Sequence, residues 1–353
     1  REPLAARLPG LDAVTFQAKI GSLGAKVKRI ESLSETISAR LDWNVLQAQR
    51  SAALSKCDLL TAMVGALPEL QGIMGAHYAV ADGDPAVVAQ AIRERYLPRG
   101  AGDGLPEAAP GTAVALADRL DTLAGIFAIG QKPTGTKDPF GLRRAAIGVL
   151  RILIEKRIDL DLRALIDTAV ALQPVKSTKA ADEVHDYIME RLRAYYLEQP
   201  GVVYTTEMID AVLATAPRSP LDFDARLAAL AGFLVRPEAA SLAAANKRIA
   251  NILKKAEGFT PAAVATATLR EPAEKQLHGA VSKLRNGVQA AVARRDYVDA
   301  LTTLAGLRGE VDAFFDSVMI NDPDPALRTN RLSLLAELRM LFSGVADLSK
   351  LPG

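Results

Sequence analysis

Apolar residues recur every three or four positions along most of this chain, the spacing of helices that bury one face. Near the N-terminus the series is Leu23, Val27, Ile30, Leu33, Ile37 and Leu41. Near the C-terminus it is Leu327, Leu334, Leu338, Leu341 and Val345. Runs of β-branched residues are scarce, which favours helices over strands. The sequence therefore predicts an all-α fold, in which Gly21 and Gly24 are expected to mark a close helix crossing.

Turn and capping residues divide the chain into separate helices. Pro85 follows Asp82-Gly83-Asp84 and marks a helix start, because proline suits the first helical position. Asp138 predicts an N-cap, with Pro139 at the first position of the next helix. The predicted helices are one or two within 13–50, then 86–96, 113–129, 138–156, 182–198 and about five pieces of 222–351.

The segments without helical spacing complete the predicted organisation. Residues 1–10 are expected to be a frayed start, and residues 98–111 form a long loop rich in proline and glycine. Loops of this length are often functional. The segment 216–220, with two prolines, indicates a boundary. The resulting division is a central helical domain over 1–170, a helical connector over 171–220 and a C-terminal helical bundle over 221–353.

Composition narrows the class of protein. The chain has 353 residues, 49% of them hydrophobic, which is enough for more than one domain with its own core. Its single cysteine, Cys57, excludes disulfides within the chain and points to a reducing compartment; we expect it to be a core residue. No apolar run approaches the roughly 20 residues of a membrane span. Because the net charge is only +2, nucleic-acid binding would depend on local basic patches.

One such patch is predicted on the helix over residues 241–257. Leu242 and Ile249 share its apolar face. At about 100° per residue, the opposite face carries four cations and an amide without any acid: Lys247, Arg248, Asn251, Lys254 and Lys255. Solvated helix faces usually mix acids and bases at i,i+4 spacing. Two interpretations stay open, a solvated face and a contact with RNA.

A second basic segment runs from Lys132 to Pro139. It lacks the glycine and lysine spacing of a phosphate-binding P-loop. It does place Lys137 beside a helix N-terminus, where anions are favoured, with Arg143 and Arg144 on the helix that follows. These three residues are predicted either to contact RNA phosphate or an acidic partner surface, or to be solvated side chains at a capped helix start.

Several longer motifs occur in a characteristic order. They are Lys56-Cys-Asp-Leu59, Pro68-Glu-Leu-Gln-Gly-Ile-Met-Gly75, Ala115-Leu-Ala-Asp-Arg-Leu-Asp-Thr-Leu123, Ile129-Gly-Gln-Lys-Pro-Thr-Gly-Thr-Lys-Asp-Pro-Phe140 and Leu142-Arg-Arg-Ala-Ala146. Near the C-terminus, Phe314-Phe-Asp-Ser-Val-Met319 precedes Asp324-Pro-Ala-Leu-Arg-Thr-Asn-Arg-Leu332. In this order they resemble the β subunit of bacterial glycyl-tRNA synthetase, from about Leu11 to the end of the chain.

The resemblance implies a function in glycine–tRNA ligation. The bundle over 221–353 resembles the α-helical anticodon-binding domain of class I arginyl-tRNA synthetases, and its expected ligand is tRNA(Gly). Catalysis would belong to a separate α subunit with a class II active site. That subunit would use ATP and Mg²⁺, so no cofactor is expected in this chain. A full-length β subunit is expected in an α2β2 cytoplasmic enzyme, without membrane or DNA partners.

The same resemblance covers only the C-terminal part of such a subunit. The chain begins at Arg1 without a methionine, which fits an excised fragment. No signature of a synthetase ATP site occurs in it. The fragment alone is therefore expected to be non-catalytic.

The domain over 1–170 resembles a His-Asp metal phosphohydrolase that has lost its ligands. Active relatives use histidines, an adjacent His-Asp pair and a distal Asp to hold metals that activate water. The resemblance matches Cys57-Asp58 to the pair and Asp118 or Asp121 to the distal carboxylate. Only three histidines exist in the chain, and only His77 lies in this domain. We therefore predict no metal site, and a buried ion-pair network of Lys56, Asp58 and Asp118.

The alternative function is a metal-dependent nucleotide phosphohydrolase with the C-terminal bundle as a regulatory module. The two functions predict different binding residues. An anticodon loop is single-stranded, so its recognition needs stacking surfaces and polar groups that read base edges. The predicted tRNA-binding residues are Arg226, Phe233, Lys247, Arg248, Asn251, Lys254, Lys255, Phe315, Arg328 and Asn330.

The apolar stripe near the C-terminus predicts different environments for two arginines. Arg331 lies between Leu327, Leu334 and Leu338 on the helical wheel and is expected to be buried. Its partner should be an acid between Glu310 and Asp324, or carbonyls at a helix end. Arg328 lies at the edge of the stripe and is the better RNA candidate. Phe314 and Phe315 are adjacent, so at most one of the two rings is expected to face outward.

Overall fold

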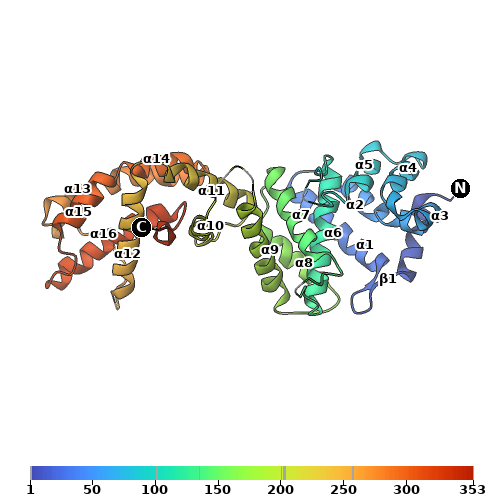
Figure 1. Ribbon diagram of the computed structural model, residues 1–353, viewed down its shortest axis with the longest axis horizontal. Helices are drawn as coiled ribbons and strands as arrows, with labels where there is room; N and C mark the ends of the chain where they lie inside the picture. Colours follow the sequence, from blue (N-terminus) through green and yellow to red (C-terminus); the bar gives the residue numbers. More distant parts are fainter. Residues whose placement is uncertain are drawn as a thin grey trace. The chain divides into compact units, whose positions relative to one another are not determined.

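The computed structural model describes residues 2–100, 102–134, 136–199, 201, 204–256 and 258–352. These residues form two compact units. Unit 1 comprises residues 1–195 and 218–221, and unit 2 comprises 196–217 and 222–353. Helices dominate both units (Figure 1), which confirms the predicted all-α class. The 171–220 segment, predicted as a separate connector, is shared between the two units.

Unit 1 consists of helices around a small hairpin. The two antiparallel strands are β1 (Thr15–Gln17) and β2 (Gly21–Ser22). The α-helices are α1 (Leu23–Arg40), α2 (Val45–Leu54), α3 (Ala62–Ala66), α4 (Ile73–Ala81), α5 (Ala86–Glu94), α6 (Ala109–Ala128), α7 (Leu142–Glu155), α8 (Leu162–Ala171) and α9 (Ala180–Leu197), which runs to the unit boundary. The 3₁₀ helices are η1 (Leu4–Ala13), η2 (Cys57–Leu60) and η3 (Pro68–Leu70).

Helix α6 forms the centre of unit 1. It packs against α1, α2, α5, α7 and α8, and Figure 1 shows it between α1 and α7. Its sequence, APGTAVALADRLDTLAGIFA, is apolar on nearly every side. A helix with this composition is buried all round. The charged residues that it does carry are consequently drawn into the interior.

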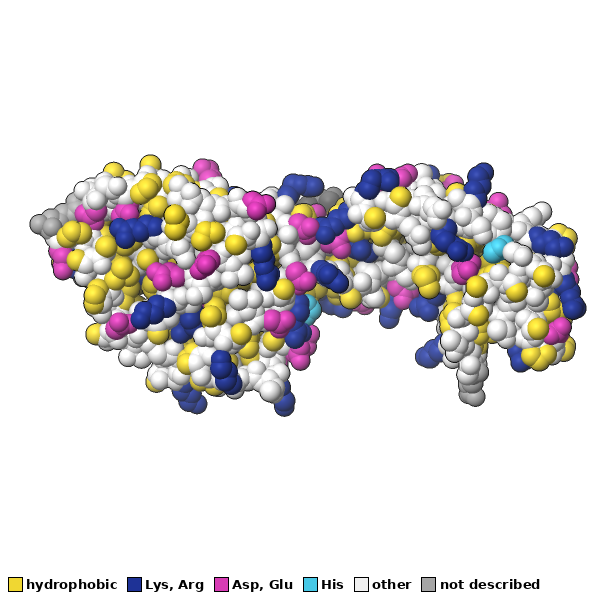
Figure 2. All heavy atoms as spheres, turned by 180° about the vertical axis from the view of Figure 1, so that it is seen from behind, with side chains coloured by type: hydrophobic (Ala, Val, Ile, Leu, Met, Phe, Trp, Pro, Cys, Tyr) yellow, Lys and Arg dark blue, Asp and Glu magenta, His cyan; other side chains and the backbone are white. Residues whose placement is uncertain are grey.

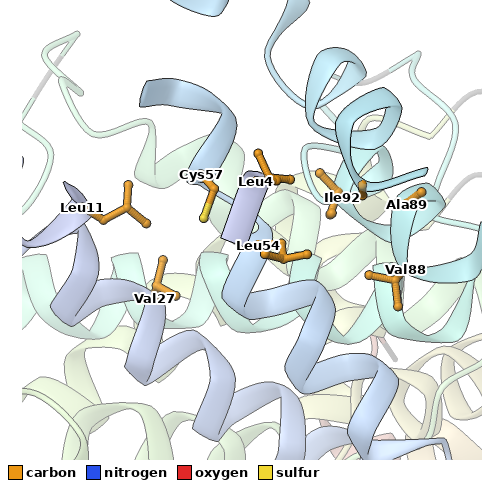
Figure 3. Close-up of a cluster of buried hydrophobic side chains, with 9 residues drawn as sticks. Leu4, Leu11, Val27, Leu54, Cys57, Val88, Ala89 and Ile92 are labelled. Atoms are coloured by element: carbon orange, nitrogen blue, oxygen red, sulfur yellow. The ribbon is translucent and has the colours of Figure 1, made fainter. Parts of the chain in front are cut away.

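A cluster beside this core includes the first residues of the chain. Leu4 and Leu11 of η1 are buried against Val27, Leu54 and Cys57 (Figure 3). The expected frayed start over 1–10 is therefore wrong, because these two leucines close an apolar surface between α1 and α2. The Cys57 side chain is fully buried, and burial raises the pKa of its thiol to about 12. Cys57 is a core residue, as the sequence predicted.

Two helices begin later than the sequence predicted, because turns precede them. The helical series before Leu23 is interrupted by the hairpin, and Ser22 Oγ caps α1 by accepting from Ala25 N at 3.1 Å. Helix α7 begins at Leu142 rather than at Pro139, after Gly141 at φ 66°. Asp138 still caps it, since its carboxylate accepts from Leu142 N at 2.8 Å and Arg143 N at 2.9 Å.

Unit 2 is a second helical bundle. Its α-helices are α10 (Thr206–Leu213), α11 (Pro220–Leu234, entering from unit 1), α12 (Ala239–Lys255), α13 (Pro272–Ala293), α14 (Tyr297–Ala305), α15 (Arg308–Ser317) and α16 (Pro325–Ser343). Two 3₁₀ helices, η4 (Thr266–Thr268) and η5 (Leu348–Lys350), complete it. Helix α13 packs on α14, α15 and α16, while α12 packs on α15, α16 and η5. The described part of 222–351 thus contains six α-helices, counting α11 from Pro220, where about five were expected.

The described helices were also compared with the dimensions of a membrane span. None of them is, singly, long and apolar enough to cross a bilayer. Helices α11 and α12 reach that length and composition only as a pair, bent by 114°. Apolar residues of both, such as Phe223, Leu230 and Leu242, are buried within unit 2.

Candidate nucleic-acid interface and the ion-pair network of unit 1

The basic face of α12, defined as Lys247, Arg248, Asn251, Lys254 and Lys255, is exposed along its whole length. Leu242 and Ile249 are buried on the opposite side, as the wheel predicted. The last buried residue of α12 is Ile249, so the C-terminal part of the helix carries its cations on a solvent-facing surface. None of these four cations forms an ion pair with any residue that the structure describes.

This face includes a hollow and an aromatic ring. A surface hollow of about 420 Å³ is lined by Lys247, Arg248, Asn251, Lys255 and two apolar neighbours. The Arg248 guanidinium lies over the Phe315 ring of α15, 4.4 Å from its centroid. Phe315 is half-buried, whereas Phe314 is fully buried and meets it edge to face. Only one of the two adjacent rings faces outward, as predicted.

Figure 2 shows basic and acidic side chains intermixed over the face of the molecule in view. The face carries no broad field of one sign, which agrees with the net charge of +2. A local surface without acids, such as the basic face of α12, is therefore the kind of feature on which nucleic-acid binding would depend.

Arg226 was predicted to bind RNA, but it is engaged inside unit 2. Its Nε pairs with Asp222 at 3.0 Å, and Nη1 donates to the carbonyls of Gly344 at 2.7 Å and Val345 at 3.2 Å. Its guanidinium also lies 4.5 Å from the Tyr297 ring centroid. Arg226 therefore satisfies the carbonyls at the C-terminal end of α16, and the structure corrects its predicted role.

Two further predicted contacts are also buried. Phe233 is 2% exposed, so its ring has no face available for a base. Asn330 is 7% exposed, and its amide accepts from Ala265 N at 2.8 Å and donates to Ala265 O at 3.1 Å. It holds the segment before η4 against α16. Arg328, in contrast, is exposed, and Arg331 is buried. The helical wheel predicted this difference in exposure between the two arginines.

The basic residues predicted around the start of α7 do not form one surface. Lys137 is exposed, but the carboxylate of Asp138 already occupies the helix N-terminus beside it. Arg143 lines a hollow that also contains Glu183, Asp186 and Glu190. Arg144 lines a different cavity, together with Arg95 and Arg99. The three residues therefore have separate environments.

The predicted ion-pair network exists around α6 and is larger than expected. Lys56 Nζ lies 2.6 Å from Asp118, and Lys26 Nζ lies 2.9 Å from both Asp118 and Asp121. Arg29 Nε completes it, 2.6 Å from Asp121. The Asp121 side chain has no exposed surface and Lys26 only 3%. Cation and carboxylate thus alternate through the core, as buried charges require.

The charged groups of the network shift one another's pKa values. Burial raises the pKa of Asp118, but Lys26, Lys56 and Arg95 outweigh it and hold this pKa well below its usual value. Burial would also raise the pKa of Asp121, yet Lys26 and Arg29 lower it. Burial lowers the pKa of Lys56 to about 8 despite the opposing charge of Asp118. The two carboxyl groups are accordingly ionised at neutral pH.

Asp58 is connected to this network through Arg95. Its Oδ2 accepts from Gly72 N at 2.5 Å, and Oδ1 lies 3.7 Å from Arg95 Nη2. His77 is exposed on α4. In the described ranges, no group of three or more His, Cys, Asp and Glu side chains is arranged to hold a metal ion. Asp58 and Asp118, which the resemblance matches to metal ligands, instead pair with arginine and lysine side chains.

Sequence reasoning missed Lys26, Arg29 and Arg95 as members of this network. A signal was present for Lys26, because at about 100° per residue it falls between Leu33 and Ile37, within the apolar stripe of α1. A cation at such a position needs an internal partner. Arg95 likewise follows Val88 and Ile92 at spacings of three to four, and it is 1% exposed.

Two family models match different parts of the chain. The family model described as "Glycyl-tRNA synthetase beta subunit" matches residues 1–214, and that of the "DALR anticodon binding domain" matches residues 242–348. The second match includes the basic face of α12, Phe315 and Arg328. The class of protein is thus a helical aminoacyl-tRNA synthetase subunit with an anticodon-binding domain.

Curated relatives identify the family. Glycine–tRNA ligase β subunits are 51% identical over 96% of this chain in Ectopseudomonas mendocina and 50% over 99% in Aeromonas salmonicida. The same subunit of Sodalis glossinidius is also 50% identical over 99% of the chain. The chain belongs to the glycyl-tRNA synthetase β-subunit family. It spans about half the length of these relatives, 49% to 51%. The alternative of a nucleotide phosphohydrolase finds no support in these comparisons.

Proposed function

We propose that unit 2 of this chain recognises the anticodon region of tRNA(Gly), as part of a glycine–tRNA ligase. The observation that carries this proposal is the basic face of α12, which is exposed, has no acidic partner within the described residues and lies inside the segment matched to an anticodon-binding domain. Phosphate contacts supply a large share of the affinity of proteins for nucleic acids. Lys247, Lys254 and Lys255 provide exposed cations for such contacts.

The contact of Arg248 with Phe315 adds a stacking surface. Bases of single-stranded loops stack on aromatic rings and on guanidinium planes. Arg248 is exposed and Phe315 is half-buried, so this pair lies at the surface beside the cations. Asn251 has an exposed amide that can both donate to and accept from base edges. Arg328 on α16 is a further exposed cation for phosphate.

The partner and the cofactors follow from the family. The proposal assigns aminoacylation to an α subunit that uses ATP and Mg²⁺, with the β subunit supplying tRNA recognition in an α2β2 cytoplasmic enzyme. Membership of the β-subunit family supports the existence of the α partner. The network around Asp118 supports a structural role for unit 1, because lysine and arginine hold its carboxylates.

The experiment is a titration of tRNA(Gly) with this chain and with Lys247→Ala/Lys254→Ala at several salt concentrations. Each lost contact with a single-stranded phosphate lowers the slope of log affinity against log salt by about 0.7. We expect weaker binding and a flatter slope in the double variant. Both lysines are exposed and have no acidic partner among the described residues, so unfolding should be unaffected.

The matched control is Lys275→Ala/Lys283→Ala, which removes two exposed lysines from α13. This variant has the same change in net charge and should bind as the unmodified chain does. If the α12 and α13 variants are equally affected, only the overall charge matters. If neither differs from the unmodified chain, the basic face of α12 is a solvated surface and the proposal is wrong.

A further inference from the structure

Unit 1 contains a cavity of about 350 Å³ beside the ion-pair network. Its wall includes the side chains of four arginines, Arg95, Arg99, Arg119 and Arg144, and a single acid, Asp118. Tyr96 and Phe140 supply aromatic surface. A volume of this size is typical of sites for small ligands. The basic lining indicates that such a ligand would be an anion.

Arg95 is the most informative residue of this wall. It is 1% exposed, and its Nη2 donates to the hydroxyl of Tyr96 and lies 3.7 Å from Asp58 Oδ1. Its Nε and Nη1 are buried without a hydrogen-bond partner among the described residues, and Nη1 lies 4.0 Å from Asp118. Buried guanidinium donors are strongly favoured to make charge-assisted bonds. Two such donors beside a cavity indicate a negatively charged occupant.

Two more arginines lie at the exposed rim of the same cavity. Arg99 follows the last residues of α5, and Arg144 lies in the first turn of α7. Both are exposed, and neither pairs with an acid in the described residues. Arg99 lies 5.7 Å from the Tyr96 ring centroid. Arg119 has a different role, since its Nη1 and Nη2 already donate to the carbonyls of Arg95, Ala115, Tyr96 and Pro98.

The carboxylate of Asp118 does not cancel this positive charge. It is paired with Lys26 at 2.9 Å and Lys56 at 2.6 Å on its inner side. Arg95 itself lies 3.7 Å from the buried Asp58. The cations in excess at this cavity are therefore Arg99 and Arg144, which pair with no acid among the described residues.

We propose that this cavity binds a phosphate ester, with Arg95 at its base and Arg99 and Arg144 at its rim. Guanidinium forks match phosphate oxygens in pairs, which makes arginine the preferred residue for such groups. Tyr96 and Phe140 form the apolar part of the wall against which the remainder of the ester would lie. The site is separate from the basic face of α12 and does not depend on the function proposed for unit 2.

The experiment measures binding of AMP and of adenosine to this chain by calorimetry, and binding of tRNA(Gly) in a second arm. The variant is Arg99→Gln/Arg144→Gln, since both residues are exposed and neither forms an ion pair within the described residues. Arg93→Gln is the control, because Arg93 is an exposed arginine of α5 outside the cavity. The two arms distinguish a free nucleotide from a phosphate of an RNA backbone.

We expect AMP but not adenosine to bind, and the double variant to lose at least tenfold in affinity while Arg93→Gln does not. If AMP does not bind, the proposal holds only if the double variant binds tRNA(Gly) more weakly than the Arg93→Gln control does. Equal binding of AMP and adenosine overturns it, as does a double variant that matches the control in both arms. Lys247→Ala/Lys254→Ala should leave AMP binding unchanged, which separates this result from the test of unit 2.

Discussion

Arg331 of α16 and Glu274 of α13 form an ion pair in which the two side chains are only 4% and 1% exposed. Arg331 Nη1 also bonds to Asp322 Oδ2 at 2.8 Å and to the carbonyl of Met319 at 2.6 Å. The partner Asp322 and the carbonyl confirm the environment predicted for this arginine. The pair with Glu274 was not predicted, and it joins two helices of unit 2 at the turn that leads into α16.

The Arg331→Ala variant should therefore be much less stable. It leaves Glu274 buried without its cation, and the loss of one member of a buried pair costs about 3–5 kcal/mol. The midpoint of urea unfolding, followed by circular dichroism, should fall accordingly. Arg328→Ala is the matched control one helical turn away, and it should keep its stability but bind tRNA(Gly) more weakly. A stable Arg331→Ala variant with impaired binding would reverse the two assignments.

The network around α6 should make unit 1 sensitive to acid. The pKa values of Asp118 and Asp121 are lower in the folded chain than in the unfolded chain. As pH falls, the unfolded state therefore takes up protons first. The stability contributed by these groups is complete above their unfolded pKa, about 3.9, and is lost as pH falls through their folded values.

The Asp118→Asn variant tests this linkage. At neutral pH it leaves Lys26 and Lys56 without one carboxylate, and the free energy of unfolding should fall by about 3 kcal/mol or more. The difference between the unmodified chain and the variant should shrink below about pH 4, where the unmodified chain also loses the charge. Thermal melts from pH 7 to pH 2.5 measure both. A difference that stays constant with pH would contradict the role of this ionised carboxylate.

Gly24 marks a close approach of α1 to η1. A Cβ added at Gly24 would lie 2.0 Å from Asp12 Oδ1 and 3.1 Å from Asp12 N. The expected crossing is thus confirmed for Gly24, although the neighbour is a 3₁₀ helix. Gly24→Ala should lower stability by roughly 1–3 kcal/mol through overpacking.

Gly65 in α3 provides the control for that substitution. Nothing lies within 4 Å of a Cβ added there. Gly65→Ala should therefore be neutral or stabilise the chain by up to about 1 kcal/mol, since alanine is the better helix former. Denaturant unfolding of the two variants compares them directly. Equal effects at the two positions would show that η1 yields to the added methyl group.

The chain alone is expected to release no phosphate from nucleotides, with or without Mn²⁺. The carboxylates that would hold a metal are paired with cations, and His77 is exposed on α4. A phosphate-release assay together with metal analysis of the purified chain measures this. Stoichiometric bound metal, with turnover abolished by Asp58→Ala, would contradict it.

The helical stripes account for what was predictable. The spacing of Leu327, Leu334 and Leu338 decides that Arg331 faces inward and Arg328 outward, and both positions agree with the structure. The same reasoning separates Phe314 from Phe315. These predictions succeeded because the spacing of residues along a helix fixes the direction in which each side chain points.

The predicted RNA contacts failed where burial came from remote segments. Arg226 is covered by the end of α16, more than a hundred residues later, with a separation of 118 to Gly344. Asn330 is bonded to Ala265 across a separation of 65 residues. Nothing near either residue in sequence indicates these partners. The basic face of α12 remains exposed in the described structure, although the Phe315 ring of α15 lies against Arg248.

The sequence by itself determined the helical class, the inward and outward faces of its helices and the membership of a synthetase family, because period and motif are local properties. Only the tertiary structure decided which charges meet. Lys26 and Asp121 are 95 residues apart and lie 2.9 Å from each other. Arg95 reaches the cavity wall beside Asp118 from a different helix. Such pairings depend on how helices pack, and the burial that makes an ion pair obligatory exists only after packing has excluded water.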